Sequence, residues 1–120
     1  MKKVIIVDDS IAVARQLEKI INSSDDFNVV AQGRNGAEAI KLYMQEKPDI
    51  ICMDMNMPVM DGLSALRTLR QTSPDVNVVM ITSLGGVSDK YAEALKLGAR
   101  DVISKPFDAE TVLKTLQKIA

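Results

Sequence analysis

The sequence predicts an α/β fold, a three-layer sandwich in which helices cover both faces of a five-stranded parallel sheet. Five short runs rich in Val and Ile alternate with longer amphipathic segments. These runs are apolar nearly throughout, which is typical of strands that are covered on both sides. Because the alternation is strict and the connections are short, successive strands are expected to run parallel. No linker or repeat interrupts the chain, so we expect one domain over residues 1–120.

The strand predictions follow the five apolar runs in chain order. Each run combines β-branched residues with a length that suits a buried strand rather than a helix. The expected strands are Lys3–Val7, Asn28–Gln32, Asp49–Met53, Asn77–Ile81 and Asp101–Ser104.

The first two helices are identified by their spacing and by a cap. Ile11–Asn22 places apolar residues at the i, i+3, i+4 spacing of an amphipathic helix. Gly36–Gln45 follows Asn35, a preferred N-cap residue, and Glu38 three residues later completes a capping box. We interpret Arg34 and Asn35 as turn and cap rather than as part of a ligand-binding loop.

The last three helices are delimited by cap and stop residues. Asp61 and Asp108 are suitable N-caps for two of them, and Gly98 is a natural residue to follow the end of the other. The expected helices are Gly62–Gln71, Ser88–Leu97 and Ala109–Ile119.

The composition excludes several classes of function. The chain has no histidine, which removes His-ligated zinc, Ser-His-Asp triads and any phosphohistidine relay. A net charge of −1 with interspersed signs argues against nucleic acid as the main partner. The apolar runs are too short to span a membrane and no secretory leader is evident, so we expect a cytoplasmic protein without a membrane partner. The single cysteine, Cys52, is expected to be a buried core thiol.

Polar side chains gather at one edge of the predicted sheet. In open α/β sheets, ligands bind outside the carboxyl ends of the strands. Three carboxylates, two hydroxyls and an amine from four strands are expected just past those ends, and this convergence indicates a functional site. The residues are Asp8, Asp9, Asp54, Thr82, Ser83 and Lys105.

Charge repulsion predicts a cation in this cluster. Two carboxylates about 4 Å apart repel by roughly 4 kcal/mol at an effective dielectric constant of about 20. A fold that is stable by only about 5–15 kcal/mol would not gather three acids around Lys105 alone. Oxygen ligands without His or Cys favour Mg²⁺, with Mn²⁺ as a substitute, and Mg²⁺ leaves positions for phosphate oxygens. The cluster therefore predicts a divalent cation beside a phosphoryl ligand.

Four motifs in this order and spacing resemble the receiver domains of two-component response regulators, in particular the stand-alone receivers of chemotaxis. The resemblance covers essentially the whole chain. It implies a flavodoxin-like fold with strand order 2-1-3-4-5 and a phosphoprotein of phosphorelay signal transduction. The motifs are Val7-Asp8-Asp9-Ser10, Met53-Asp54-Met55-Asn56-Met57-Pro58-Val59-Met60-Asp61-Gly62, Ile81-Thr82-Ser83 and Lys105-Pro106-Phe107.

The resemblance implies an acceptor and a set of metal ligands. Asp54 corresponds to the phosphoacceptor, whose carboxylate attacks phosphorus to form an acyl phosphate. Asp9 corresponds to a direct Mg²⁺ ligand and Asp8 to a ligand acting through water. Asp54 itself and the backbone carbonyl of Asn56 complete the implied coordination by the protein.

The resemblance also implies two groups that contact the phosphoryl group. Lys105 corresponds to the lysine that pairs with it, and the following bond to Pro106 is expected to be cis, aiming the amine at the site. Thr82 corresponds to the hydroxyl that moves to the phosphoryl group after transfer, and Ser83 is the adjacent small residue. Phosphoryl transfer asks mainly for positioning and charge stabilisation, which Mg²⁺, Lys105 and Thr82 can each supply to one oxygen.

The implied function is a switch rather than a metabolic enzyme. The family takes its phosphoryl group from a histidine kinase or small phosphodonors and catalyses its own hydrolysis. The implied partners are that kinase, a downstream target protein or the flagellar motor switch, and a phosphatase. The receiver itself is expected to be a monomer.

Two positions bear on how such a switch is read out and reset. Relatives often carry an aromatic residue three positions before the lysine, where this chain has Val102. A charge-assisted hydrogen bond from Thr82 contributes about 1.5–3 kcal/mol, whereas driving a two-state switch nearly to completion takes about 5.5 kcal/mol. We therefore expect phosphorylation to bias the populations and partner binding to complete the change. Asn56 and Leu84 stand where relatives tune the hydrolysis rate.

Other classes of protein are weighed against this interpretation. A haloacid-dehalogenase-type phosphatase also forms an aspartyl phosphate, but it needs a second acid where this chain has Asn56. A flavodoxin-like nucleotide binder needs a phosphate loop rich in Gly, Ser and Thr, whereas Asp8 and Asp9 would repel phosphate. A pseudo-receiver would be expected to lack an acid or the lysine. The chain also suits the receiver part of a longer regulator with a DNA-binding or methylesterase output.

Overall fold

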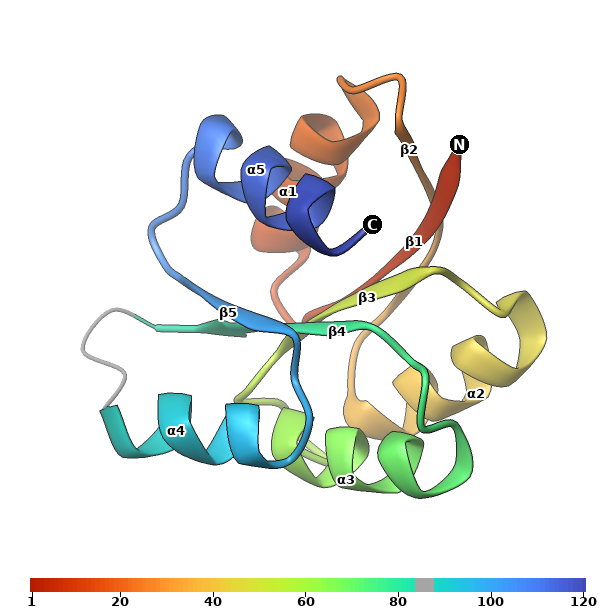
Figure 1. Cartoon of the computed structure of the whole chain (residues 1–120), viewed down its shortest axis with the longest axis vertical. Helices are drawn as coiled ribbons and strands as arrows, with labels where there is room; N and C mark the ends of the chain where they lie inside the picture. The colour runs from red at the N-terminus through yellow and green to blue at the C-terminus, as the bar shows by residue number, and fades with distance from the viewer. Residues whose placement is uncertain (84–87) are drawn as a thin grey trace.

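The computed structural model describes residues 1–83 and 88–120, so Leu84 lies outside the described residues. Strands and helices alternate along the chain as the sequence predicts (Figure 1). The strands are β1 Lys2–Val7, β2 Phe27–Gly33, β3 Ile50–Asp54, β4 Val78–Thr82 and β5 Asp101–Ser104. The helices are α1 Ile11–Asn22, α2 Gly36–Glu46, α3 Gly62–Thr72, α4 Ser88–Lys96 and α5 Ala109–Ile119. In this part of the chain no helix combines the length and the apolarity needed to cross a bilayer.

The strands pair in parallel in the order β2-β1-β3-β4-β5. Helices α1 and α5 cover one face of the sheet, and α2, α3 and α4 cover the other (Figure 1). This arrangement confirms the predicted three-layer sandwich and its strand order. The order reverses between β1 and β3, and such a switch point is where open α/β sheets bind ligands.

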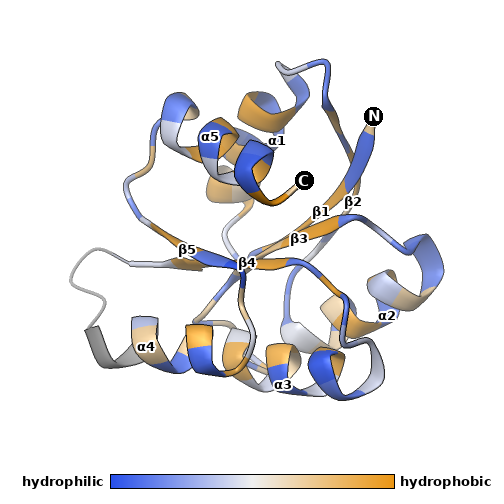
Figure 2. Cartoon of the chain, viewed as in Figure 1, coloured by the Kyte–Doolittle hydropathy of each residue, from blue (hydrophilic) through white to orange (hydrophobic). Residues whose placement is uncertain are grey.

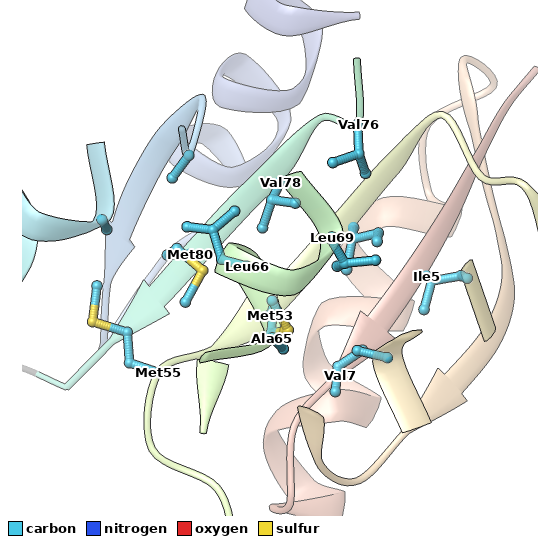
Figure 3. Close-up of a cluster of buried hydrophobic side chains, with 14 residues drawn as sticks. Ile5, Val7, Met53, Met55, Ala65, Leu66, Leu69, Val76, Val78 and Met80 are labelled. Carbon is cyan, nitrogen blue, oxygen red and sulfur yellow. The ribbon is translucent and has the colours of Figure 1, made fainter. Parts of the chain in front are cut away.

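The core consists of one hydrophobic cluster on each face of the sheet, because successive strand residues point to opposite sides. On the face covered by α3, Leu66 and Leu69 lie over Val78 and Met80 of the sheet (Figure 3). Hydrophobic residues run along the central strands and alternate with hydrophilic ones around the helices (Figure 2). Cys52 is fully buried in the cluster on the other face, and this burial raises the pKa of its thiol to about 12. The predicted core thiol is confirmed.

Strands β3 and β4 each begin and end one residue later than predicted. Asp54 and Thr82 are therefore the last residues of their strands, not the first residues beyond them. The reason is that the ladder continues past both residues. The backbone N–H of Met55 donates to the carbonyl of Ile81 at 3.0 Å, and that of Lys105 donates to the carbonyl of Thr82 at 2.7 Å.

Three of the predicted helix caps are present. The side chains of Asn35, Asp61 and Asp108 each accept a hydrogen bond from the backbone N–H three residues later, at 2.9, 2.8 and 2.7 Å. The predicted capping box is displaced by one residue, because the carboxylate of Glu38 accepts from the N–H of Arg34 at 2.8 Å. The loop before α2 is thus fixed at Arg34 as well as at its cap.

Candidate functional site

The register of the sheet brings two of the predicted acids together. Val7 of β1 pairs with Met53 of β3, so the residues that follow them, Asp8 and Asp54, stand side by side. Asp9 comes next in the loop after β1, and one oxygen of each of the three carboxylates lies within 4.8 Å of the others. Asp8 and Asp54 are only 1% and 4% exposed, whereas Asp9 faces solvent. The predicted convergence of three acids is present.

Lys105 bridges the two buried acids from the end of β5. Its Nζ lies 3.4 Å from Asp8 Oδ2 and 3.4 Å from Asp54 Oδ1. Its side chain is 22% exposed, so the ion pairs are partly shielded from water. The bond from Lys105 to Pro106 is cis, as expected. One ammonium group thus faces two carboxylates, and the cluster keeps an excess of negative charge.

The donor set fits a divalent cation. Asp8 Oδ1 accepts a hydrogen bond from the N–H of Ser10 at 2.8 Å. Asp8 Oδ2 is buried and receives no hydrogen bond from the described residues, although Lys105 is within ion-pair distance. A buried oxygen of this kind is costly unless a cation or a donor satisfies it. Carboxylate oxygens without His or Cys are ligands that Mg²⁺ and Mn²⁺ accept.

Burial raises the pKa of Asp54 above its ordinary value, and the neighbouring Asp8 carboxylate raises it further. Lys105 and the backbone N–H of Asn56 act in the opposite direction and lower it. The net effect is a raised pKa, so the ionised carboxylate of Asp54 is less favourable in this site than in water. A second cation beside Asp54 would reverse this balance, because it favours the charged form.

The hydroxyls and Asn56 occupy different positions around the acids. Thr82 is buried at the end of β4, one residue past Ile81, which pairs with Asp54. Ser83 and Asn56 are exposed. The structure therefore brings Asp8, Asp9, Asp54 and Lys105 into direct proximity and sets Thr82 on the neighbouring strand.

Two neighbours of the site were not predicted from the sequence. Gly62 begins α3 so close to β3 that a Cβ would collide with the carbonyl oxygen of Asp54 and stand 2.7 Å from Met80 Cε. Arg34 reaches from the loop before α2 to the carbonyl oxygen of Asp8, 3.4 Å from its Nη1. The Asp61-Gly62 pair in the third-strand motif was a signal for the first contact. The second depends on the path of a long side chain, which no local pattern reveals.

Comparison with known proteins decides the family. The family model described as the response regulator receiver domain matches residues 4–117. The chain belongs to the response regulator receiver family. Its members include signalling proteins that resemble this receiver over its whole length. A chemotaxis protein CheY of Listeria monocytogenes is 42% identical over 120 residues, which is 100% of this chain and 99% of that protein.

Longer proteins and solved structures agree with this placement. A protein-glutamate methylesterase/protein-glutamine glutaminase of Methanococcoides burtonii is 39% identical over 115 residues, covering 95% of this receiver but 32% of that protein. A chain of the CheX–CheY–BeF3–Mg²⁺ complex from Borrelia burgdorferi superimposes with a TM-score of 0.92 at 32% identity. That match covers 98% of this receiver and 88% of the other chain. The family thus includes both signalling proteins of this length and larger proteins that contain a receiver.

Proposed function

We propose that this receiver accepts a phosphoryl group on Asp54, with Mg²⁺ held beside it by Asp8, Asp9, Asp54 and the carbonyl of Asn56. The observation that carries the proposal is the cluster of three carboxylates within 4.8 Å of one another around Lys105. Mn²⁺ substitutes for Mg²⁺ in the same oxygen site. Asp54 is the acceptor because it stands at the end of a central strand and forms an ion pair with Lys105. Its raised pKa also means that the negative charge of its carboxylate is unfavourable in this site.

In the transfer, an oxygen of Asp54 forms a bond to phosphorus. The P–N bond of a phosphohistidine donor, or the P–O bond of acetyl phosphate, breaks at the same centre, and its electron pair leaves with the donor. Bound Mg²⁺ supplies positive charge to the phosphoryl oxygens. Lys105 supplies a second positive charge from its place 3.4 Å from Asp54 Oδ1. The hydroxyl of Thr82 donates to a phosphoryl oxygen after the transfer. The receiver catalyses this reaction and its own dephosphorylation and no other.

The signalling role is a phosphorylation-dependent change of partner binding, and chemotaxis is its setting. The support is the full-length similarity to CheY proteins, with both chains covered almost completely. The phosphodonor is a histidine kinase, and the output is a downstream target protein or the flagellar motor switch. A phosphatase partner is supported by the complex of a CheY relative with CheX. The receiver acts in the cytoplasm as a monomer, without nucleic acid or membrane as a direct partner.

A receiver within a longer regulator is the second candidate. It is favoured by the similarity to the methylesterase, of which the matching region is 32%.

A haloacid-dehalogenase-type phosphatase finds less support, because Asn56 offers no second acid for protonation of a leaving group. Incubation with phosphorylated small molecules separates the phosphatase from the receiver, since a phosphatase rapidly hydrolyses many equivalents, whereas a receiver accumulates one phosphoryl group per chain and loses it slowly.

Intact-protein mass after incubation with acetyl phosphate tests the proposal. We expect a gain of one phosphoryl group that depends on Mg²⁺ and is absent from Asp54→Asn. Asp25→Asn removes an exposed acid just before β2, at the amino ends of the strands and away from the site. It is the matched control and should be phosphorylated like the wild type. A folded wild type that gains no phosphoryl group from any donor would contradict the proposal and favour a receiver that signals by binding alone.

A further inference from the structure

Arg34 links the loop before α2 to the loop that carries two of the acids. Its Nη1 lies 3.4 Å from the carbonyl oxygen of Asp8 and 3.3 Å from the carbonyl oxygen of Gly33. The carbonyl of Gly33 also accepts the N–H of Asp8 at 3.0 Å, which continues the pairing of β1 with β2 by one residue. The guanidinium group therefore lies where β1 ends and the loop with Asp8 and Asp9 begins.

Both ends of Arg34 are held in place. Its backbone N–H donates to Glu38 Oε1 at 2.8 Å, and Glu38 is fixed in turn because its own N–H donates to the cap Asn35 at 2.9 Å. At the other end, Nη2 donates to Gln32 Oε1 on β2 at 3.3 Å. The side chain is half-buried, so solvent competes only in part for these donors. A planar guanidinium group can make such forked contacts, which a lysine amine cannot reproduce.

The carbonyl that Arg34 contacts belongs to the peptide between Asp8 and Asp9. Asp9 is exposed, so the direction of its carboxylate depends chiefly on the backbone that carries it. Asp8 is buried and hydrogen-bonded to Ser10, and it needs less external support. An anchor on this peptide thus acts mainly on the orientation of Asp9.

We propose that Arg34 is a positioning residue of the cation site, which fixes the Asp8–Asp9 peptide and so aims the carboxylate of Asp9 at the bound ion. This inference rests on the proposed function, because it requires a divalent cation at the three acids. Partners that orient metal ligands typically change metal affinity by about 10–100-fold when they are removed. Since the contacts of Arg34 are long, we expect a loss near the lower limit, about tenfold.

If only the positive charge of Arg34 mattered, its removal would have the opposite effect on the affinity for Mg²⁺. A guanidinium group near a cation site repels the ion, and its removal would tighten binding if charge were its only effect. The two effects differ in what Arg34→Lys does. Lysine keeps the charge but loses the fork, so a positioning role predicts weaker binding in Arg34→Lys as well as in Arg34→Ala.

Isothermal titration with MgCl2 of the unphosphorylated chain measures this directly. We expect the dissociation constant for Mg²⁺ to rise about tenfold in Arg34→Ala and by at least as much in Arg34→Lys, which keeps the repelling charge. Arg67→Ala, which removes an exposed arginine of α3, is the matched control and should bind Mg²⁺ like the wild type. With acetyl phosphate, the Mg²⁺ concentration for half-maximal phosphorylation should rise by the same factor, while the rate at saturating Mg²⁺ stays close to that of the wild type.

Three results would overturn the inference. Arg34→Ala that binds Mg²⁺ as tightly as the wild type, or more tightly, would show that positioning by Arg34 does not dominate its effect on the affinity. Arg34→Lys with the affinity of the wild type would show that the contacts of the guanidinium group are not needed, and it decides the matter even when Arg34→Ala fails to fold. A wild type that binds no Mg²⁺ would refute the proposed function, and this inference with it, whereas normal binding in the wild type leaves only the role of Arg34 in question.

Discussion

The α-carbon of Gly62 faces the carbonyl oxygen of Asp54, with no space for a side chain between them. This contact lets the first turn of α3 pack directly on the strand that ends in the candidate phosphoacceptor. The N–H of Gly62 also donates to the carbonyl of Met55 at 2.9 Å, which ties the helix to the residue after Asp54. The position of Asp54 thus depends on the absence of a side chain at Gly62.

Gly62→Ala should therefore destabilise the fold by about 3 kcal/mol, near the upper end of overpacking costs. The added Cβ would collide with the backbone of Asp54 in the buried strand β3, and this backbone cannot move aside as a flexible side chain can. Gly33→Ala is the matched control, because its Cβ would meet only side-chain atoms of Leu42 and Glu38 at 3.1 and 3.2 Å. It should cost about 1 kcal/mol. Urea denaturation measures both, and equal losses in the two variants would refute the stated role of Gly62.

The raised pKa of Asp54 predicts how pH changes stability in the absence of Mg²⁺. At neutral pH the ionised carboxylate is less favourable in the folded chain than in the unfolded chain, so Asp54→Asn should be more stable than the wild type. As pH falls through the folded pKa of Asp54 toward the ordinary value of 3.8, the wild type takes up a proton and this disadvantage disappears. Urea denaturation over this range should show the gap between the variants closing. A gap that widens in acid would mean that the pKa is lowered instead.

Lys105→Met should lower both stability and the rate of phosphorylation. It leaves Asp8 and Asp54 without their shared cation, and because Lys105 is partly exposed we expect a loss of about 1–2 kcal/mol, less than for a fully buried pair. Removal of one group that stabilises transferring charge should slow phosphorylation about a hundredfold. Lys114→Met removes an exposed lysine paired with Glu110 and should change stability by less than about 0.5 kcal/mol. Equal effects of the two substitutions on the phosphorylation rate would argue against a role for Lys105 in transfer.

Val102 predicts an incomplete switch. It is half-buried and packs as an aliphatic residue against the hydrophobic cluster that includes Ala94 of α4. The proposed hydrogen bond from Thr82 to the phosphoryl group would contribute about 1.5–3 kcal/mol, which falls short of the roughly 5.5 kcal/mol that full conversion requires. NMR spectra of the phosphorylated chain alone should therefore report a mixture of two states around β5. Complete conversion without any partner would contradict this expectation.

Much of the fold followed from local patterns. The apolar runs gave the strands, and Asn35, Asp61 and Asp108 marked the starts of three helices because capping is a property of neighbouring residues. The strand order came from the family resemblance and not from the runs themselves. The meeting of Asp8 with Asp54 was predictable because both follow apolar runs of adjacent parallel strands.

The remaining features depend on contacts between distant segments. The ends of β3 and β4 shifted by one residue because bonds to the neighbouring strands extend the ladder, and hydropathy does not detect such bonds. The reach of Arg34 to Asp8, 26 residues earlier in the chain, depends on the rotamer of a long side chain that Gln32 of β2 helps to hold. Both features became visible only when segments that are far apart in sequence were placed together.

The location of the phosphoryl group tests the central claim most directly. After incubation with acetyl phosphate and Mg²⁺, the acyl phosphate can be reduced with borohydride and the altered residue identified by peptide mass spectrometry. We predict modification of Asp54 alone, and an unmodified protein when Asp54→Asn is treated in the same way. Modification of Asp8 or Asp9 in the wild type, or a hydroxylamine-stable phosphate on Thr82 or Ser83, would contradict the assignment of Asp54 as the acceptor.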